Sequence, residues 1–271
     1  MISGYHTTAL TEHDLATAGA LLRQLGFGTM AVRLSLSRLD PLADGDVLRQ
    51  QLTILATGLR DLRLVVDADG PYLIDPWDPQ VPALMDQEDE AGRRRLDYLL
   101  STIDMVEQLG GGLVTFAVGR QPAEMETERA LDALTEALLE LGDRAESQGV
   151  LLGVRPRQGH FVDSVGRFER LVRWAGESPV VQLAADVGSM VTGGEMPVVD
   201  LLGRVGDRLA GVYLSEARLV GGEPLIGSGS VSATRVVAGL RAERFAGPVI
   251  VEPAVASGPE EAGRFYKAVF G

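Results

Sequence analysis

The chain has 271 residues, a length typical of one α/β barrel. It contains no cysteine, which excludes disulfides, zinc–thiolate sites and cysteine nucleophiles. The net charge of −13 is spread along the chain and disfavours binding to nucleic acid or to anionic membranes. No apolar run approaches the roughly 20 residues that span a bilayer, and the first residues lack signal-peptide features. We expect a cytoplasmic protein with a small-molecule partner; a homo-oligomer is compatible with the sequence.

Short apolar runs with strand character recur along the chain. They are residues 1–5 (the weakest), 31–36, 62–66, 112–118, 150–154, 180–184, 209–214 and 248–251. Between them, apolar residues recur at three- and four-residue steps, which predicts helices; clear examples run from 96 to 109, 131 to 141 and 165 to 175. Near-continuous apolar strands that alternate with helices indicate a parallel sheet covered by helices.

Helix starts are marked by capping residues. Thr11 with Asp14 predicts a capping box, and Asp163 predicts the N-cap of the helix that follows it. Pro259, followed by two glutamates, predicts the first position of the last helix.

Eight strand–helix units predict a (β/α)8 barrel that forms a single domain over residues 1–271. An open doubly wound sheet is the alternative fold. That fold usually carries a glycine-rich phosphate loop after its first strand, whereas residues 4–8 read Gly-Tyr-His-Thr-Thr. The Gly-Ser-Gly sequence at 227–229 follows no predicted strand and is weak evidence for a phosphate site.

Polar residues stand where the predicted strands end, which is where barrels carry their chemistry. They are Tyr5, His6, Arg33, Ser35, Asp67, Asp69, Arg155, Arg157, His160, Asp186, Ser189, Tyr213, Ser215, Glu216 and Glu252. Because an unpaired buried charge is costly, we expect a mixed cluster of carboxylates, guanidinium groups and imidazoles. For each member, an ion pair that only ties strands together is the alternative to a functional role.

A long polar segment follows the third predicted strand, from Asp67 to about Asp89. Its length and its prolines are typical of a loop over the barrel mouth. Tyr72 and Trp77 stand within it, and we expect the segment to close as a lid that brings Trp77 to the substrate.

Several short motifs together resemble the xylose isomerase-like barrels, a superfamily that includes sugar-phosphate isomerases and epimerases, inosose dehydratases and type 2 AP endonucleases. The motifs are Gly-Tyr-His-Thr-Thr at 4–8, Leu-Gly-Phe at 25–27, Leu-Gly at 109–110, Ala-Asp-Val-Gly at 185–188, Leu-Ile-Gly-Ser-Gly-Ser-Val at 225–231 and Gly-Pro-Val-Ile-Val-Glu at 247–252. No single motif is decisive, but their order and spacing are specific for the fold.

The resemblance implies a divalent metal in the barrel mouth, and this sequence departs from the usual ligands. Asp186 and Glu252 match two of them, whereas Arg155 stands in place of a glutamate and Ser189 in place of a histidine. A further histidine position is taken by the segment from Tyr213 to Glu216. Arginine has no lone pair for a metal, and its charge repels a cation.

We therefore expect no cofactor, with a divalent metal as the disfavoured alternative. Arg155 is predicted to pair with Asp186 or Glu252 and to supply the missing positive charge.

Three functions follow from these residues. The first is a metal-independent isomerase, epimerase, dehydratase or cyclase that acts by acid–base chemistry on a small metabolite, with secondary metabolism as one setting. In it, Glu252 or Asp186 is the base and His160, Tyr213 or Glu216 the acid. Arg155, with Arg157 or Arg33, stabilises an enolate, and the substrate contacts are His6, Arg33, Asp67, Trp77, Arg157 and Ser189. The second is a non-catalytic barrel that binds a metabolite or a protein. The third is a sugar-phosphate isomerase or epimerase with an unusual metal-ligand set.

Overall fold

In the computed structural model, the eight strands form a closed barrel in which each strand neighbours the next along the chain. The structure describes residues 1–271 except 70–80, 87–89, 177, 216–231 and 254–257, and except the side chain of residue 91. The predicted (β/α)8 barrel is confirmed, and the open doubly wound sheet is wrong. Within the described residues, no helix has both the length and the apolar character needed to cross a membrane.

The chain divides into two compact units, of which the first contains Met1–Val32, Thr53–Val65 and Ala184–Gly271. It includes β1 (Ile2–His6), η1 (Thr7–Ala9), α1 (Leu15–Leu25), β2 (Thr29–Arg33) up to residue 32, the end of α2 (Gly45–Leu59) and the start of β3 (Arg63–Asp67). It continues with the end of β6 (Val181–Asp186), α6 (Val187–Thr192), α7 (Val198–Val205), η3 (Gly206–Arg208), β7 (Leu209–Ser215), α8 (Ala233–Ala242), β8 (Pro248–Glu252) and α9 (Pro259–Val269).

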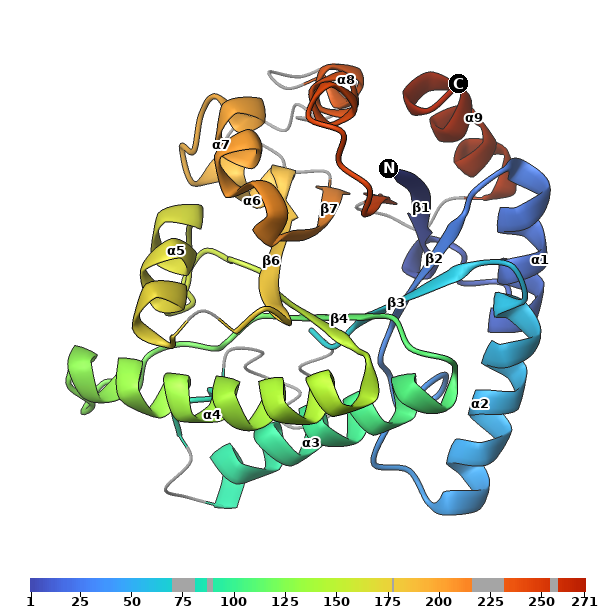
Figure 1. The fold of residues 1–271 in the computed structure, drawn as a ribbon. Coiled ribbons are helices and arrows are strands. Elements are labelled where there is room, and N and C mark those ends of the chain that lie inside the picture. The colour runs from blue at the N-terminus through green and yellow to red at the C-terminus, as the bar shows by residue number, and fades with distance from the viewer. Residues whose placement is uncertain (70–80, 87–89, 177, 216–231, 254–257) are drawn as a thin grey trace. The chain divides into compact units, whose positions relative to one another are not determined.

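Parallel pairing fixes the register of the strands in this unit. Gly4 pairs with Thr29 of β2 and with Ile250 of β8, and Ser215 at the end of β7 pairs with Glu252 at the end of β8. Three aromatic rings join α9 to the end of α1, where Figure 1 shows the two helices side by side. The rings of Phe27 and Tyr266 meet edge to face at 5.0 Å, and Phe270 completes the cluster.

Two glycines bring α1 close to the end of α2. A Cβ atom added to Gly19 would lie 2.1 Å from the carbonyl oxygen of Gly58, and one added to Gly58 would lie 2.2 Å from the carbonyl oxygen of Leu15. Only residues without a side chain allow this approach of two backbones. Arg23 then donates a hydrogen bond to the same carbonyl of Gly58.

The second unit contains Arg33–Leu52 and Val66–Leu183. Its complete elements are α3 (Glu90–Gln108), β4 (Leu113–Phe116), α4 (Thr127–Gln148), β5 (Leu151–Val154) and α5 (Val165–Trp174). Strand β5 lies between β4 and the start of β6, and both pairings are parallel. Helices α3 and α4 run side by side, drawn in green in Figure 1.

Local signals placed the elements well but missed some of their ends. Asp14 caps α1 by accepting from the amide of Thr17, so the helix begins after Asp14, and the capping box predicted from Thr11 is wrong. Ser164, not Asp163, caps α5. The second strand was predicted at 31–36 and spans Thr29–Arg33, because the chain turns at Ser35, whose backbone pairs with that of Leu39.

Candidate functional site

Asp67, at the end of β3, is the centre of an ion-pair cluster in the second unit. Its side chain is fully buried, and Oδ2 accepts two hydrogen bonds from Arg33, from Nε at 2.9 Å and from Nη2 at 2.7 Å. Nη1 of Arg155, which directly follows β5, lies 3.7 Å from the same oxygen. Arg155 is 1% exposed and Arg33 about one third exposed. The cluster therefore holds one buried guanidinium and one that is partly exposed.

One partner of Arg155 is a carboxylate that the sequence did not suggest for it. Its described ion pair is with Asp67, which had been predicted only as a substrate contact. A pairing of Arg155 with Asp186 or Glu252 stays a prediction, because those residues belong to the other unit.

A second ion pair lies next to the first and fixes the loop after β5. Nε of Arg157 donates to Oδ2 of Asp69 at 2.8 Å. The other oxygen of Asp69 accepts from the amide of Ala117, just beyond β4, and the amide of Asp69 donates to Oδ1 of Asp67. The two aspartates are thereby joined, and each holds an arginine.

His160 ends this loop as a neutral imidazole. Burial lowers the pKa of His160 to about 4, and the guanidiniums of Arg95, Arg157 and Arg120 act in the same direction, whereas Asp69 opposes them. Nδ1 accepts a hydrogen bond from the amide of Gly119 at 3.0 Å, so the proton of the neutral ring is on Nε2. At neutral pH His160 is a hydrogen-bond donor through Nε2 rather than a charged acid.

Helix α3 contributes two buried polar side chains that the sequence analysis missed. Arg95 donates to the carbonyls of Pro82 and Ala117, and burial lowers its pKa. Tyr98, one turn later, is buried, and its hydroxyl has no hydrogen-bond partner among the residues that the structure describes. Burial, followed by the charge of Asp67, raises the pKa of Tyr98 well above its usual value. The sequence feature that could have identified these two residues is their position beside the apolar stripe of this helix, next to Leu96 and Leu99.

In the first unit, Asp186 has a clear structural role. It ends β6 and caps α6, because Oδ1 accepts from the amide of Ser189 at 3.0 Å. The hydroxyl of Ser215, at the end of β7, donates to the same oxygen, and Ser215 also accepts from the amide of Gly188. The side chain of Asp186 is 3% exposed, so it joins two strand ends inside the protein.

His6 and Tyr213 are fully buried in the same unit, with ring centroids 6.3 Å apart. Nδ1 of His6 lies 2.7 Å from the hydroxyl of Thr8 and accepts from its amide, which favours the tautomer with the proton on Nε2. Glu252 ends β8 and is half-buried. Glu216, Trp77 and most of the predicted lid lie outside the described residues.

Two of the positions that the resemblance assigns to metal ligands do not carry the family's residues. Arg155 offers no lone pair. Ser189 contributes its backbone amide to the cap of α6, and Oδ1 of Asp186 already accepts two hydrogen bonds there.

Three strands end in a residue whose side chain could act as a metal ligand. These residues are His6 of β1, Asp67 of β3 and Glu252 of β8. Asp67, however, lies against the guanidiniums of Arg33 and Arg155, and both positive charges oppose a cation at its carboxylate.

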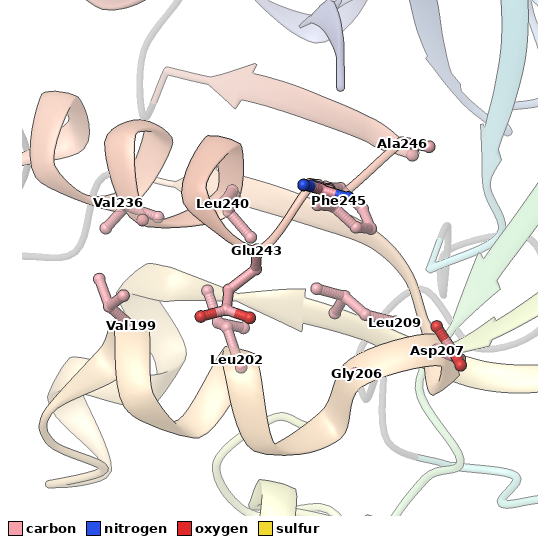
Figure 2. Close-up of a pocket in the computed structure, with 14 residues that line it drawn as sticks. Val199, Leu202, Gly206, Asp207, Leu209, Val236, Leu240, Glu243, Phe245 and Ala246 are labelled. Carbon is pink, nitrogen blue, oxygen red and sulfur yellow. The ribbon is translucent and has the colours of Figure 1, made fainter.

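A cavity of about 410 Å³ lies elsewhere in the first unit, between α7 and α8. Figure 2 shows the carboxylate of Glu243 between Leu202 and Leu240, which face it from the two helices. Leu209 and Gly247, at the beginnings of β7 and β8, complete its wall. The beginnings of barrel strands are associated with stability rather than catalysis, so the strand ends remain the candidate active site.

Comparisons with known proteins agree with this architecture. The family model described as xylose isomerase-like TIM barrel matches residues 20–268. A 3-keto-D-glucoside 4-epimerase from E. coli is 16% identical with a TM-score of 0.75, and the match covers 99% of this chain and 98% of that one. A D-psicose 3-epimerase, solved in the presence of D-fructose, is also 16% identical with a TM-score of 0.75, and both chains are covered completely. An L-ribulose 3-epimerase has a TM-score of 0.67 at 16% identity, with 97% of this chain and 86% of that chain covered. No curated protein matches the chain in sequence. At these identities the structural matches show the fold.

Proposed function

The chain belongs to the xylose isomerase-like TIM barrel family, and from that premise we propose that it is an isomerase or epimerase of a small sugar-like carbonyl compound. The observation that carries the proposal is the buried ion-pair cluster around Asp67, in which Arg155 is held at the end of β5. A buried guanidinium at a strand end of a barrel is placed where the chemistry of this fold occurs. The epimerases among the structural matches support the substrate class.

The reaction requires removal of a proton from the carbon next to a carbonyl. The electron pair of the broken C–H bond moves into the C–C bond, and the carbonyl oxygen becomes an enolate oxygen. Return of a proton to the other face of the carbon gives the epimer, and return to the neighbouring carbon after proton transfer between the oxygens gives the isomer. Both outcomes use the same enolate, as would a dehydration.

Arg155 is the residue we assign to the enolate oxygen. Its guanidinium stays charged at any working pH, and Nη1 lies within ion-pair distance of Asp67, at 3.7 Å. A fixed donor of this kind lowers the barrier by about 3–4 kcal/mol when it faces the developing negative charge. Because the arginine supplies the positive charge, the proposed reaction needs no metal.

Glu252 is the preferred general base. Asp186 caps α6 and accepts the hydroxyl of Ser215, and these hydrogen bonds favour a structural role for its carboxylate. Glu252 ends β8 and is half-buried. Tyr213 and Glu216 remain the proposed acids, since His160 is neutral at physiological pH.

Solvent deuterium exchange tests the proposal without knowledge of the product. The protein is first treated with a chelator. It is then incubated in D2O with D-fructose, D-psicose, L-ribulose or a 3-keto-glucoside, and the incorporation of deuterium at carbon is measured by NMR. We expect exchange for at least one compound, and a loss of about 10²-fold or more for Glu252→Gln and Arg155→Met. Arg170→Met, an exposed arginine on α5, is the control and should exchange at the wild-type rate.

Two results would argue against this function. Saturable binding of a sugar without any exchange would identify a non-catalytic binding barrel. Exchange that appears only after addition of a divalent metal would identify a metal-dependent enzyme.

A further inference from the structure

We propose that Arg157 and His160, on the loop after β5, form a binding site for an oxyanion group of the substrate, a carboxylate or a phosphate. This inference extends the proposed function, because it assigns a charged group to the sugar-like substrate. Its support comes from the orientation of Arg157, the tautomer of His160 and the charges around them.

Arg157 is held in a fixed orientation by one edge of its guanidinium. Nε donates to Asp69, whose side chain is only 8% exposed. Among the described residues, Asp69 is the hydrogen-bond partner of this guanidinium. The N–H groups of its two terminal nitrogens can therefore donate to a ligand. The side chain of Arg157 is 31% exposed, which lets those donors reach a ligand. Planar guanidinium donors match the paired oxygens of carboxylate and phosphate.

The loop itself is fixed by backbone hydrogen bonds. The amide of Arg155 donates to the carbonyl of Phe116, and the amide of Phe161 donates to the carbonyl of Gly119. The amide of His160 donates to the carbonyl of Arg157, which brings the two side chains onto one turn. A ligand at this turn would therefore meet donors whose positions are set before it binds, at a smaller entropic cost.

His160 adds a neutral donor beside this charge. Its Nδ1 is used by the amide of Gly119, whose φ of +92° is a conformation that glycine adopts readily. The proton on Nε2 is then the one that the ring offers to a ligand. The imidazole is partly exposed, so a ligand can approach it.

The charges around the imidazole favour an anion. Of the charged groups that shift the pKa of His160, three are guanidiniums (Arg95, Arg120 and Arg157) and one is a carboxylate (Asp69). Arg95 is a fixed buried charge, because its donors are held by the carbonyls of Pro82 and Ala117. Arg157 supplies the positive charge that an oxyanion would meet at this turn, beside the carboxylate of Asp69.

Direct titration tests the site. Imidazole signals of His160 are followed by NMR while inorganic phosphate, or in a separate series acetate, is added at constant ionic strength adjusted with chloride. We expect saturable shifts, and at least a tenfold weaker affinity in Arg157→Gln. Arg170→Gln removes the same charge from an exposed position on α5 and should leave the affinity unchanged. Saturation by phosphate at the lower concentration would favour a phosphate as the bound group, and saturation by acetate at the lower concentration a carboxylate.

Arg157→Lys provides a second variant that keeps the charge but loses the planar donors, and we expect an affinity between those of the wild type and Arg157→Gln. Circular dichroism verifies the folding of each variant. Shifts that do not saturate, or that are the same in wild type and both variants, would overturn the site. The titration needs no turnover, so an active enzyme that binds neither anion would reject this inference and leave the proposed isomerase intact.

Discussion

Nη1 of Arg155 lies 3.7 Å from Oδ2 of Asp67, and both side chains are almost completely buried. Asp67 is held at the same time by two hydrogen bonds from Arg33. One carboxylate therefore balances a guanidinium inside the protein and another that reaches the surface.

Arg155→Ala should destabilise the protein by less than the full cost of breaking a buried pair, which is about 3–5 kcal/mol, because Arg33 still accompanies Asp67. Urea denaturation measures the change in the free energy of unfolding. Arg49→Ala breaks the exposed pair of Arg49 with Asp46 and should cost about 0–1 kcal/mol. Equal losses for the two variants would show that the buried pair contributes nothing beyond a surface pair.

Asp186→Ala should cost about 0.5–2 kcal/mol through loss of the α6 cap, with a further loss from the unpaired hydroxyl of Ser215. Asp186→Asn keeps the oxygen that accepts from the amide of Ser189 and should be nearly as stable as the wild type. Thermal unfolding of the two variants, measured side by side, checks the difference. If Asn and Ala are equally destabilising, the negative charge matters more than the cap.

The titration of His160 should have its midpoint near pH 4, as followed by the chemical shifts of its ring. Its pKa in the folded protein lies below the value of about 6.5 in the unfolded chain, so the unfolded chain binds more protons between these two pH values. The stability linked to His160 is therefore fully present above pH 6.5 and is lost as the pH falls toward 4. His160→Gln should remove this part of the pH dependence. A midpoint near 6.5 in the folded protein would contradict the burial of a neutral ring.

Chelator treatment should leave the melting temperature unchanged, and elemental analysis of the purified protein should find no stoichiometric divalent metal. The physical reason is that Arg155 and Ser189 replace metal ligands, while Asp67 is already held by Arg33 and Arg155. A loss of several degrees that one added metal restores would refute this prediction and favour a metal-dependent enzyme.

Gly19→Ala and Gly58→Ala should each destabilise the protein by several kcal/mol, because the new methyl group would meet a backbone carbonyl and force α1 away from α2. Gly166→Ala is the matched control, since no atom lies within 4 Å of the added Cβ on α5. That substitution should stabilise its helix by about 0.5–1 kcal/mol. Chemical denaturation of the three variants measures the change in the free energy of unfolding. A mild effect at both Gly19 and Gly58 would show that the two helices can separate at little cost.

Local patterns in the sequence predicted the fold and which polar residues stand at the strand ends. The alternation of strand-like and helix-like apolar segments predicted the barrel, because this periodicity is a property of each segment and its burial. The same segments located the strand ends, and so predicted His6, Arg33, Asp67, Arg155 and Glu252 as rim residues. The predicted bounds of β2 were less accurate, because the residues around the turn at Ser35 are as apolar as those of the strand.

The partners of those residues were decided only by the tertiary structure. Asp69 and Arg157 are 88 positions apart and meet because β3 and β5 end in the same unit, a proximity that no local pattern records. For the same reason the sequence did not identify Asp67 as a partner of Arg155, whereas the pairing with Asp186 or Glu252 stays a prediction. Arg95 and Tyr98 were missed because they stand on a helix whose pattern reads as packing, and only burial beside the aspartates shows their polar role. Periodicity fixes which face of a segment is buried, whereas charge pairing depends on the distances between segments, and these exist only once the chain has folded.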